Sequence, residues 1–342
     1  MAANRSLRRL RIARGALILG LLAALPIAIA ADHGGSLRNQ NPLLQIFGLP
    51  PFQSAPIAGV DSNNYNLSFD IVNHAESGSN PLESIVMDGE SYFLMLSLRR
   101  GFSDRLELGI DVPFVAHAGG FLDSAIENWH DLLGLSNSKR RGADDQLGFR
   151  YSKEGQTLYE LNSTTRSIGD IQLTAAIPLR KSDAEDPLSV SLRSSIKLPT
   201  GSVSELSGSG AADFSLGIYA SNQYTLWQRG LDISAFAGIL LLGDGDILSG
   251  LQRNSVPYGG VAASLWLADR FGVAAQLQVE GPYYDSDLEE LGGASAQLAV
   301  GFDYRLPRDG ALLHFSITED IASGTTTTPD FGIHFSISKA GR

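Results

Sequence analysis

The amino-acid sequence predicts an all-β protein, a single antiparallel transmembrane β-barrel of about 12 strands. Three features of the 342-residue chain predict this class. Apolar and polar residues alternate through most of the chain after Val60, the alternating segments are long, and short and long connections follow one another in turn. This combination is typical of barrels that span a membrane with tilted strands.

The alternation gives each segment one apolar and one polar side. From Leu106 to Phe114 every second residue is apolar, whereas the residues between them include Glu107 and Asp111. Successive side chains of a strand point to opposite faces, and about 9–11 tilted residues cross a bilayer core. Twelve such segments are present, at about 63–73, 90–100, 104–116, 168–180, 187–199, 210–224, 230–242, 256–267, 270–282, 293–306, 310–320 and 330–338.

The connections predict two different ends of the barrel. Tight turns at 101–103, 181–186, 225–229, 268–269 and 307–309 alternate with longer links at 74–89, 117–167, 200–209, 243–255, 283–292 and 321–329. An even strand number places both termini at the end with the short turns, which we expect to be periplasmic. A large soluble β-sandwich is the alternative, but it gives no reason for the loop lengths to alternate, whereas lipid requires every strand edge to be paired.

The first 30 residues predict a signal peptide. Five arginines between Arg5 and Arg14 precede an apolar run that ends in Ala28-Ile29-Ala30, the small-x-small pattern of a cleavage site. The run is shorter than the roughly 20 residues of a spanning helix, and an N-terminal anchor is the alternative. We therefore expect a signal peptide at 1–30, an irregular segment at 31–59 and the barrel at 60–342.

The composition excludes several partners and chemistries. Removing the five arginines from the 26 basic residues leaves 21, against 37 acidic ones. Nucleic acid is excluded as a partner because phosphate binding needs a basic surface. The chain has no cysteine, which excludes disulfides, thiolate chemistry and lipidation at the cleavage site.

The stretch from Asn39 to Ala55 is apolar but is interrupted by prolines, so it forms neither a good helix nor a good central strand. We expect it to fold into the lumen from the periplasmic mouth and to act as a plug. It would pack mainly on Phe236 and Trp266, while its amides meet polar walls. The alternative is an element of the rim or an assembly signal. The plug residues are Asn39, Asn41, Pro42, Leu43, Phe47, Pro50 and Phe52.

The polar side of the strands predicts a lumen of mixed charge. Such a lumen either holds a water-filled path or is closed by ion pairs, and both alternatives stay open. Several inward positions are apolar instead, which suggests a wall for the plug or a path for a hydrophobic ligand. The predicted lumen residues are Arg99, Arg105, Asp111, Arg193, Lys197, Asp213, Tyr219, Phe236, Trp266, Asp303, Arg305, His314 and His334.

The longest link, 117–167, contains apolar residues at helical spacing between Phe121 and Leu133. This pattern predicts a short amphipathic helix that either lies on the outer rim or acts as a lid over the pore.

The sequence offers no specific catalytic or metal site. None of the six histidines has the spacing of zinc ligands, and no cofactor motif is present. His314 and His334 fall on adjacent strands and are expected to be neighbours in the lumen. A serine–histidine lipid hydrolase is a minority alternative, because no serine has a base partner fixed by spacing.

Two motifs carry a resemblance to a known family. They are RNQNPLLQIFGLPPFQSA at Arg38–Ala55 and TTPDFGIHFSIS at Thr327–Ser338. With them the chain resembles an uncharacterised bacterial family, domain of unknown function 3187, from about Arg38 to Ser338. The resemblance implies no activity and no functional residue. More loosely, the plan is similar to the long-chain fatty-acid transporters, whose N-terminal segment plugs the barrel, although fewer strands are predicted here.

These features predict a protein of the Gram-negative outer membrane, with membrane lipid and the outer-membrane assembly machinery as partners. The favoured function is passive transport or binding of a small solute, through a porin-like channel that suits a hydrophobic or amphipathic compound. A closed barrel with a structural or assembly role is the second hypothesis. A lipid-modifying enzyme is the third.

Overall fold

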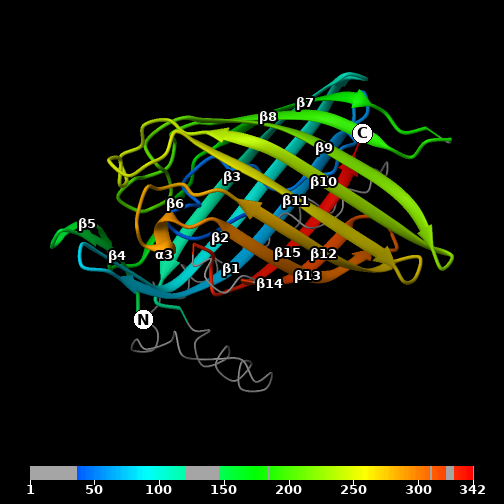
Figure 1. The fold of residues 1–342 in the computed structure, drawn as a ribbon. Helices are drawn as coiled ribbons and strands as arrows, with labels where there is room; N and C mark the ends of the chain where they lie inside the picture. The colour runs from blue at the N-terminus through cyan, green and yellow to red at the C-terminus, as the bar shows by residue number, and fades with distance from the viewer. Residues whose placement is uncertain (1–36, 121–145, 184, 309, 321–326, 342) are drawn as a thin grey trace, which may run out of the picture.

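The computed structural model describes residues 37–341, except 121–145, 184, 309 and 321–326. Twelve long antiparallel strands form a closed ring, because the first strand pairs with the last from Asn63 opposite Gly341 to Asn73 opposite Phe331 (Figure 1). The strands are β1 (Asn63–Ser79), β2 (Glu83–Ser103), β3 (Leu106–Ala118), β7 (Gln172–Arg180), β8 (Ser189–Lys197), β9 (Asp213–Leu226), β10 (Arg229–Leu241), β11 (Ser255–Trp266), β12 (Phe271–Glu280), β13 (Ser295–Arg305), β14 (Leu312–Asp320) and β15 (Phe331–Gly341). The predicted twelve-stranded barrel is confirmed.

The two faces of the strands have opposite polarity. Large apolar side chains such as Leu108, Ile218 and Val300 are exposed on the outside, whereas Asp111 and Lys197 are buried inside. On the outer face an aromatic ladder crosses neighbouring strands, with ring centroids 4.9–6.0 Å apart; its members are Phe271, Phe302, Phe315 and Phe335. An apolar outer band with aromatic rows is the surface expected of a barrel in lipid.

The barrel has a turn end and a loop end. At the turn end β2 joins β3, β9 joins β10 and β13 joins β14 through short turns, and β15 ends beside the start of β1. The links that join β8 to β9, β10 to β11 and β12 to β13 lie at the loop end, together with the short helix α3 (Glu289–Gly292) (Figure 1). No helix among the described residues is long and apolar enough to span a membrane.

The predicted long link at 74–89 is wrong. β1 and β2 continue beyond the barrel as a hairpin, with Ser79 opposite Ser84, and β4 (Gly148–Lys153) and β5 (Gln156–Leu161) extend it sideways. Ile85 and Met87 are buried against Phe149 and Tyr151 in the same apolar cluster as the loop containing α3. We call β4, β5 and this extension of β1 and β2 the external sheet. Burial of its apolar face in this cluster stabilises the external sheet.

The short strand β6 (Thr165–Ile168) also lies in the 117–167 link and pairs with the end of β3. The helix predicted between Phe121 and Leu133 lies outside the described residues.

Candidate functional site

Residues 37–60, here called the inner segment, run through the interior of the barrel. Leu37 contacts Gln276 in the middle of β12, and the chain then rises to the loop end, where Leu43 contacts Tyr284. From there it descends along β8 and β9 to the turn end, where Val60 forms a β-bridge with Gly101. Its large apolar side chains between Leu43 and Phe52 are buried; these are Leu43, Leu44, Ile46, Phe47, Leu49 and Phe52.

At the loop end the inner segment forms a compact turn that is fixed by polar contacts. The Gln45 amide donates a hydrogen bond of 2.6 Å to the carbonyl of Leu206, and the Tyr284 hydroxyl donates one of 3.0 Å to the carbonyl of Leu43. Burial raises the pKa of Tyr284, so this hydroxyl remains a donor. Phe47 stacks on Tyr283 with ring centroids 5.4 Å apart.

Lys197 of β8 holds the middle of the inner segment. Its ammonium group lies 2.7 Å from Asp170 and 3.1 Å from Asp213, and it donates a hydrogen bond of 2.8 Å to the carbonyl of Ile46. Asp213 accepts a bond of 2.8 Å from the amide of Gly48. A Cβ atom at Gly48 would lie 2.9 Å from the Cβ of Lys197, so only glycine permits this approach.

Arg193 of β8 holds the descending part of the inner segment. One nitrogen contacts Glu107 and the side-chain oxygen of Gln53, both at 2.8 Å. The other donates bonds of 2.9 Å to the carbonyls of Ser54 and Pro56. A guanidinium group can satisfy so many acceptors because it presents five donors in a fixed plane.

An aromatic stack completes this side of the lumen. Phe52 lies on Phe236, with ring centroids 5.4 Å apart, and Phe236 stacks on Tyr219 at 5.5 Å with the rings nearly parallel. We call this side the anchoring wall. It consists of Arg193, Lys197, Asp213, Tyr219 and Phe236.

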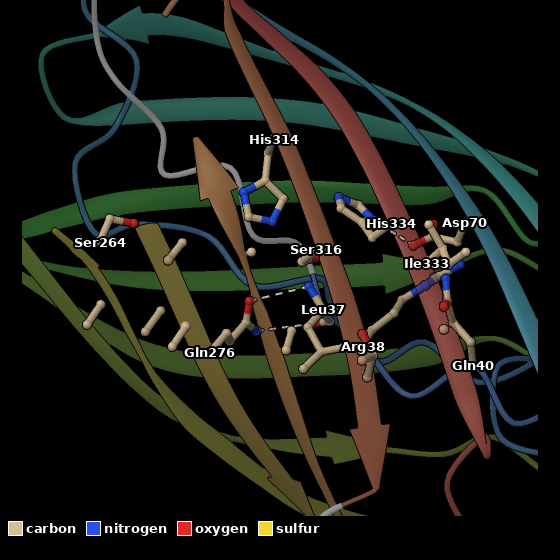
Figure 2. Close-up of a pocket in the computed structure, with 18 residues that line it drawn as sticks. Leu37, Arg38, Gln40, Asp70, Ser264, Gln276, His314, Ser316, Ile333 and His334 are labelled. Atoms are coloured by element: carbon tan, nitrogen blue, oxygen red, sulfur yellow. Dashed lines mark hydrogen bonds and ion pairs between the residues drawn. The ribbon is translucent and has the colours of Figure 1, made fainter. Parts of the chain in front are cut away.

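The opposite side of the lumen satisfies its charges within itself. His334 contacts Asp70 at 2.6 Å and His314 contacts Asp303 at 2.7 Å, while the two imidazole rings lie 5.6 Å apart. Figure 2 shows both rings beside the same cavity. We call this side the histidine wall, defined by Ser264, Gln276, His314 and His334.

The histidine wall touches the inner segment only lightly through Gln276. The amide of Leu37 lies 3.4 Å from the side-chain oxygen of Gln276, and the Gln276 nitrogen lies 3.5 Å from the carbonyl of Leu37 (Figure 2). Hydrogen bonds of this length are weak.

Most of the predicted lumen residues are buried inside the barrel, but two differ from expectation. Arg105 lies in the turn before β3 and is exposed, because the alternation was extended beyond the start of the strand. Trp266 is buried but donates a hydrogen bond to Asp232, and the Arg305 guanidinium lies 3.7 Å above its ring. Phe52 therefore meets Phe236, and Trp266 stacks with Arg305 instead of the inner segment.

Sequence reasoning missed a buried chain of hydrogen bonds near the loop end. His74 contacts the Ser91 hydroxyl at 2.9 Å, Ser91 contacts Nδ1 of His117 at 2.8 Å, and Nε2 of His117 lies 3.1 Å from the carbonyl of Leu206. Since a carbonyl only accepts, Nε2 of His117 carries the proton and Ser91 donates to Nδ1. This chain could have been predicted from Ser91 and His117, which are polar residues at inward positions of the neighbouring strands β2 and β3. The tyrosine pair Tyr283–Tyr284 was missed because it lies in a loop.

The described residues contain no group of three or more side chains arranged to hold a metal ion. Arg193 and Lys197 instead contact carboxylates of the barrel and the backbone of the inner segment.

Comparisons with known proteins agree with this architecture. The model of a family described as "Protein of unknown function (DUF3187)" matches residues 19–340. Among curated proteins, none matches this chain. The chain is similar to a solved structure of the COG4313 outer membrane channel from Pseudomonas putida F1, with a TM-score of 0.50 and 13% identity over 86% of this chain and 97% of that one.

Two further solved structures are less similar. The Pseudomonas putida toluene transporter TodX gives a TM-score of 0.39 and 9% identity, over 90% of this chain and 98% of that one. A Pseudomonas aeruginosa FadL homologue gives 0.37 and 11%, over 90% and 99%. At 13% identity the likeness to the COG4313 outer membrane channel concerns the fold alone.

Proposed function

The chain belongs to the DUF3187 family, and we propose that it is an outer-membrane channel for a small solute whose path is closed at rest by the inner segment. The turn end faces the periplasm and the loop end faces the outside. No catalytic step is assigned to the protein. Its partners are membrane lipid, the outer-membrane assembly machinery and the solute.

One observation carries this proposal. The inner segment fills part of a polar lumen but belongs to no strand of the barrel, and its backbone is held by side chains such as Arg193 and Lys197. An element attached in this way leaves the strand pairing intact when it moves, because the twelve strands close on one another without it.

The inner segment also suits a gate better than a permanent core. Its prolines, including Pro50 and Pro51, prevent it from joining the sheet, so it depends on side-chain contacts alone. Burial of Phe47 and Phe52 stabilises it by roughly 1.5–3 kcal/mol per side chain, against an ordering cost of about 1–2 kcal/mol per residue. The charged contacts of the anchoring wall add to this stabilisation.

A closed barrel with a structural role is the second candidate, and the same anchoring contacts favour it. The purified protein in planar bilayers separates the two. We expect few openings from the native chain and frequent discrete steps after deletion of residues 39–55, with heat-resistant folding retained. The Arg105→Ala variant, in an exposed turn, is the control and should behave like the native chain.

If neither the native nor the deleted chain conducts ions in the bilayer, the channel hypothesis is wrong and the structural barrel is favoured. Lipid turnover by the purified protein would point to the third hypothesis, an enzyme. A deletion variant with unchanged conductance would show that the inner segment does not close the path.

A further inference from the structure

A small cavity separates the inner segment from the histidine wall (Figure 2). Its free volume of about 20 Å³ has room for one or two water molecules. Arg38 and Leu37 of the inner segment form one side, and His314 and His334 form part of the other. The rest of the surface consists largely of small residues; they include Ala262, Ala274, Ala299, Gly301 and Gly332.

Arg38 is a buried guanidinium with unused donors. Its side chain is 7% exposed and lies over the ring of Phe93, 5.9 Å from the centroid. The carboxylates that act on it electrostatically are Asp70 and Asp111, and these already contact His334 and Arg99. Among the described residues Arg38 has no hydrogen bond or ion pair, and it lines the cavity. A buried cation without hydrogen bonds is costly, so a guanidinium in this position suits the binding of an anion.

His314 offers an unused acceptor at the same cavity. Its Nδ1 lies 2.7 Å from Asp303, whose second oxygen accepts a bond of 3.1 Å from Ser264. Because a carboxylate only accepts, Nδ1 carries the proton, so Nε2 is the acceptor position of a ring that bears one proton. This Nε2 atom is buried and has no hydrogen-bond partner among the described residues.

We propose that this cavity binds a small carboxylic acid that also carries a hydroxyl group. The carboxylate contacts the guanidinium of Arg38, the hydroxyl donates to Nε2 of His314, and the small residues accommodate the carbon skeleton. Arginine suits a carboxylate because two parallel N–H donors match its two oxygens. The proposal rests on the channel function and specifies its solute.

The contacts of the inner segment show how the cavity gains room for this solute. The bonds between Leu37 and Gln276 are 3.4 and 3.5 Å long, whereas those on the anchoring wall are mostly 2.8–2.9 Å. Leu37 and Arg38 are therefore held less tightly than Asn39, whose side-chain amide donates a hydrogen bond of 3.1 Å to the carbonyl of Thr327. Displacement of Leu37 and Arg38 opens the cavity while Asn39, Lys197 and Arg193 keep their contacts.

Ligand-observed saturation-transfer NMR on the full chain in detergent tests the proposal. The probes are 3-hydroxybutyrate, butyrate and 2-butanol. We expect 3-hydroxybutyrate to bind more tightly than butyrate, since a site with a buried acceptor discriminates against a ligand without the donor. The alcohol, which lacks the carboxylate, should not bind.

Three variants assign the site. Arg38→Gln should weaken binding of both acids by about tenfold or more, because a charge-assisted contact is lost. Ala274→Leu fills the cavity without changing a charge and should abolish binding. Arg105→Gln, which lies in an exposed turn, should bind like the native chain, and heat-resistant mobility on gels verifies folding of each variant.

Native-like binding by Arg38→Gln or Ala274→Leu would overturn the assigned site, and so would absence of binding by 3-hydroxybutyrate. Equal binding of butyrate would overturn the hydroxyl contact. Conductance measured in parallel separates the two proposals: a protein that binds the hydroxy acid but conducts nothing retains this site and loses the channel function.

Discussion

Both walls of the lumen carry basic side chains that contact carboxylates, but they use them differently. On the anchoring wall, Arg193 and Lys197 direct donors to backbone carbonyls of the inner segment at 2.8–2.9 Å. On the histidine wall, His314 and His334 are paired with Asp303 and Asp70 of the barrel itself. One wall thus holds the segment, and the other leaves a cavity beside it.

This difference shows that the charge composition of a lumen does not determine whether it is open. A charged side chain that bonds to an internal segment closes the space between them. A charge paired with its neighbour on the sheet leaves the space beside it free. The path of a solute should therefore follow the histidine wall.

The largest effect is expected for Lys197→Met on the anchoring wall. Lys197 is 1% exposed and lies between Asp170 and Asp213, so its loss leaves two buried carboxylates without a cation. We expect the free energy of unfolding in urea to fall by about 3–5 kcal/mol. Lys181→Met, which removes an exposed contact of 3.4 Å to Asp104, is the control and should cost less than about 1 kcal/mol. Similar losses in the free energy of unfolding from both variants would show that Lys197 stabilises the protein no more than an exposed ion pair does.

The second prediction compares apolar residues of the inner segment that face the two walls. Phe52 is 4% exposed and lies against Phe236, whereas Leu37 is only partly buried beside Gln276. Phe52→Ala should lower the free energy of unfolding by about 3 kcal/mol, and Leu37→Ala by roughly 1 kcal/mol. Urea titration of both variants checks this, and a larger loss from Leu37→Ala would reverse the comparison.

The third prediction concerns mobility at the histidine wall. Gln276→Ala removes three long contacts, two to Leu37 and one of 3.4 Å to Gln278, so the free energy of unfolding should change by less than about 0.5 kcal/mol. A thiol introduced by Gln40→Cys should nevertheless react faster with a soluble reagent. Gln278→Ala, whose side chain bonds to Glu280 on its own strand, is the matched control. Equal thiol reactivity in both backgrounds would contradict a loosely held start of the inner segment.

The fourth prediction concerns the external sheet. Burial raises the pKa of Glu83, but hydrogen bonds from Lys153 and Ser286 outweigh it and lower that pKa from 4.5 to about 2. Because the folded pKa is the lower one, the stabilisation is present above pH 4.5 and is lost as the pH falls towards 2.

A dye on Thr157→Cys should report loosening of β5 over this pH range, since the chain has no other cysteine. Glu83→Gln should remove the pH dependence. A transition that persists in this variant would assign it to another group.

The strands could be predicted because their signal is local. Alternation within ten residues defines the two faces of a strand, and the turns at Asp104 and Trp227 interrupt it where the chain reverses. The hairpin at 74–89 was missed because Gly78, Asn80 and Pro81 indicate a loop, although strand pairing continues around them. Nothing local distinguished a turn of three residues from a longer link.

The contacts across the lumen could not be predicted in the same way. Whether Lys197 reaches Ile46 or Arg193 reaches Ser54 depends on the tilt and stagger of the strands, which no short stretch of sequence specifies. The neighbouring positions of His314 and His334 were predictable because their strands are consecutive. The approach of Arg38 to the same cavity was not.

The bridge between Val60 and Gly101 has a consequence for the kinetics of closure. The inner segment is continuous with β1, so a displaced segment remains tethered at the turn end. Its rebinding is an intramolecular reaction with an effective concentration in roughly the millimolar range, independent of how much protein the membrane contains. The segment that closes the barrel is part of the same chain, so dilution of the protein does not dissociate it.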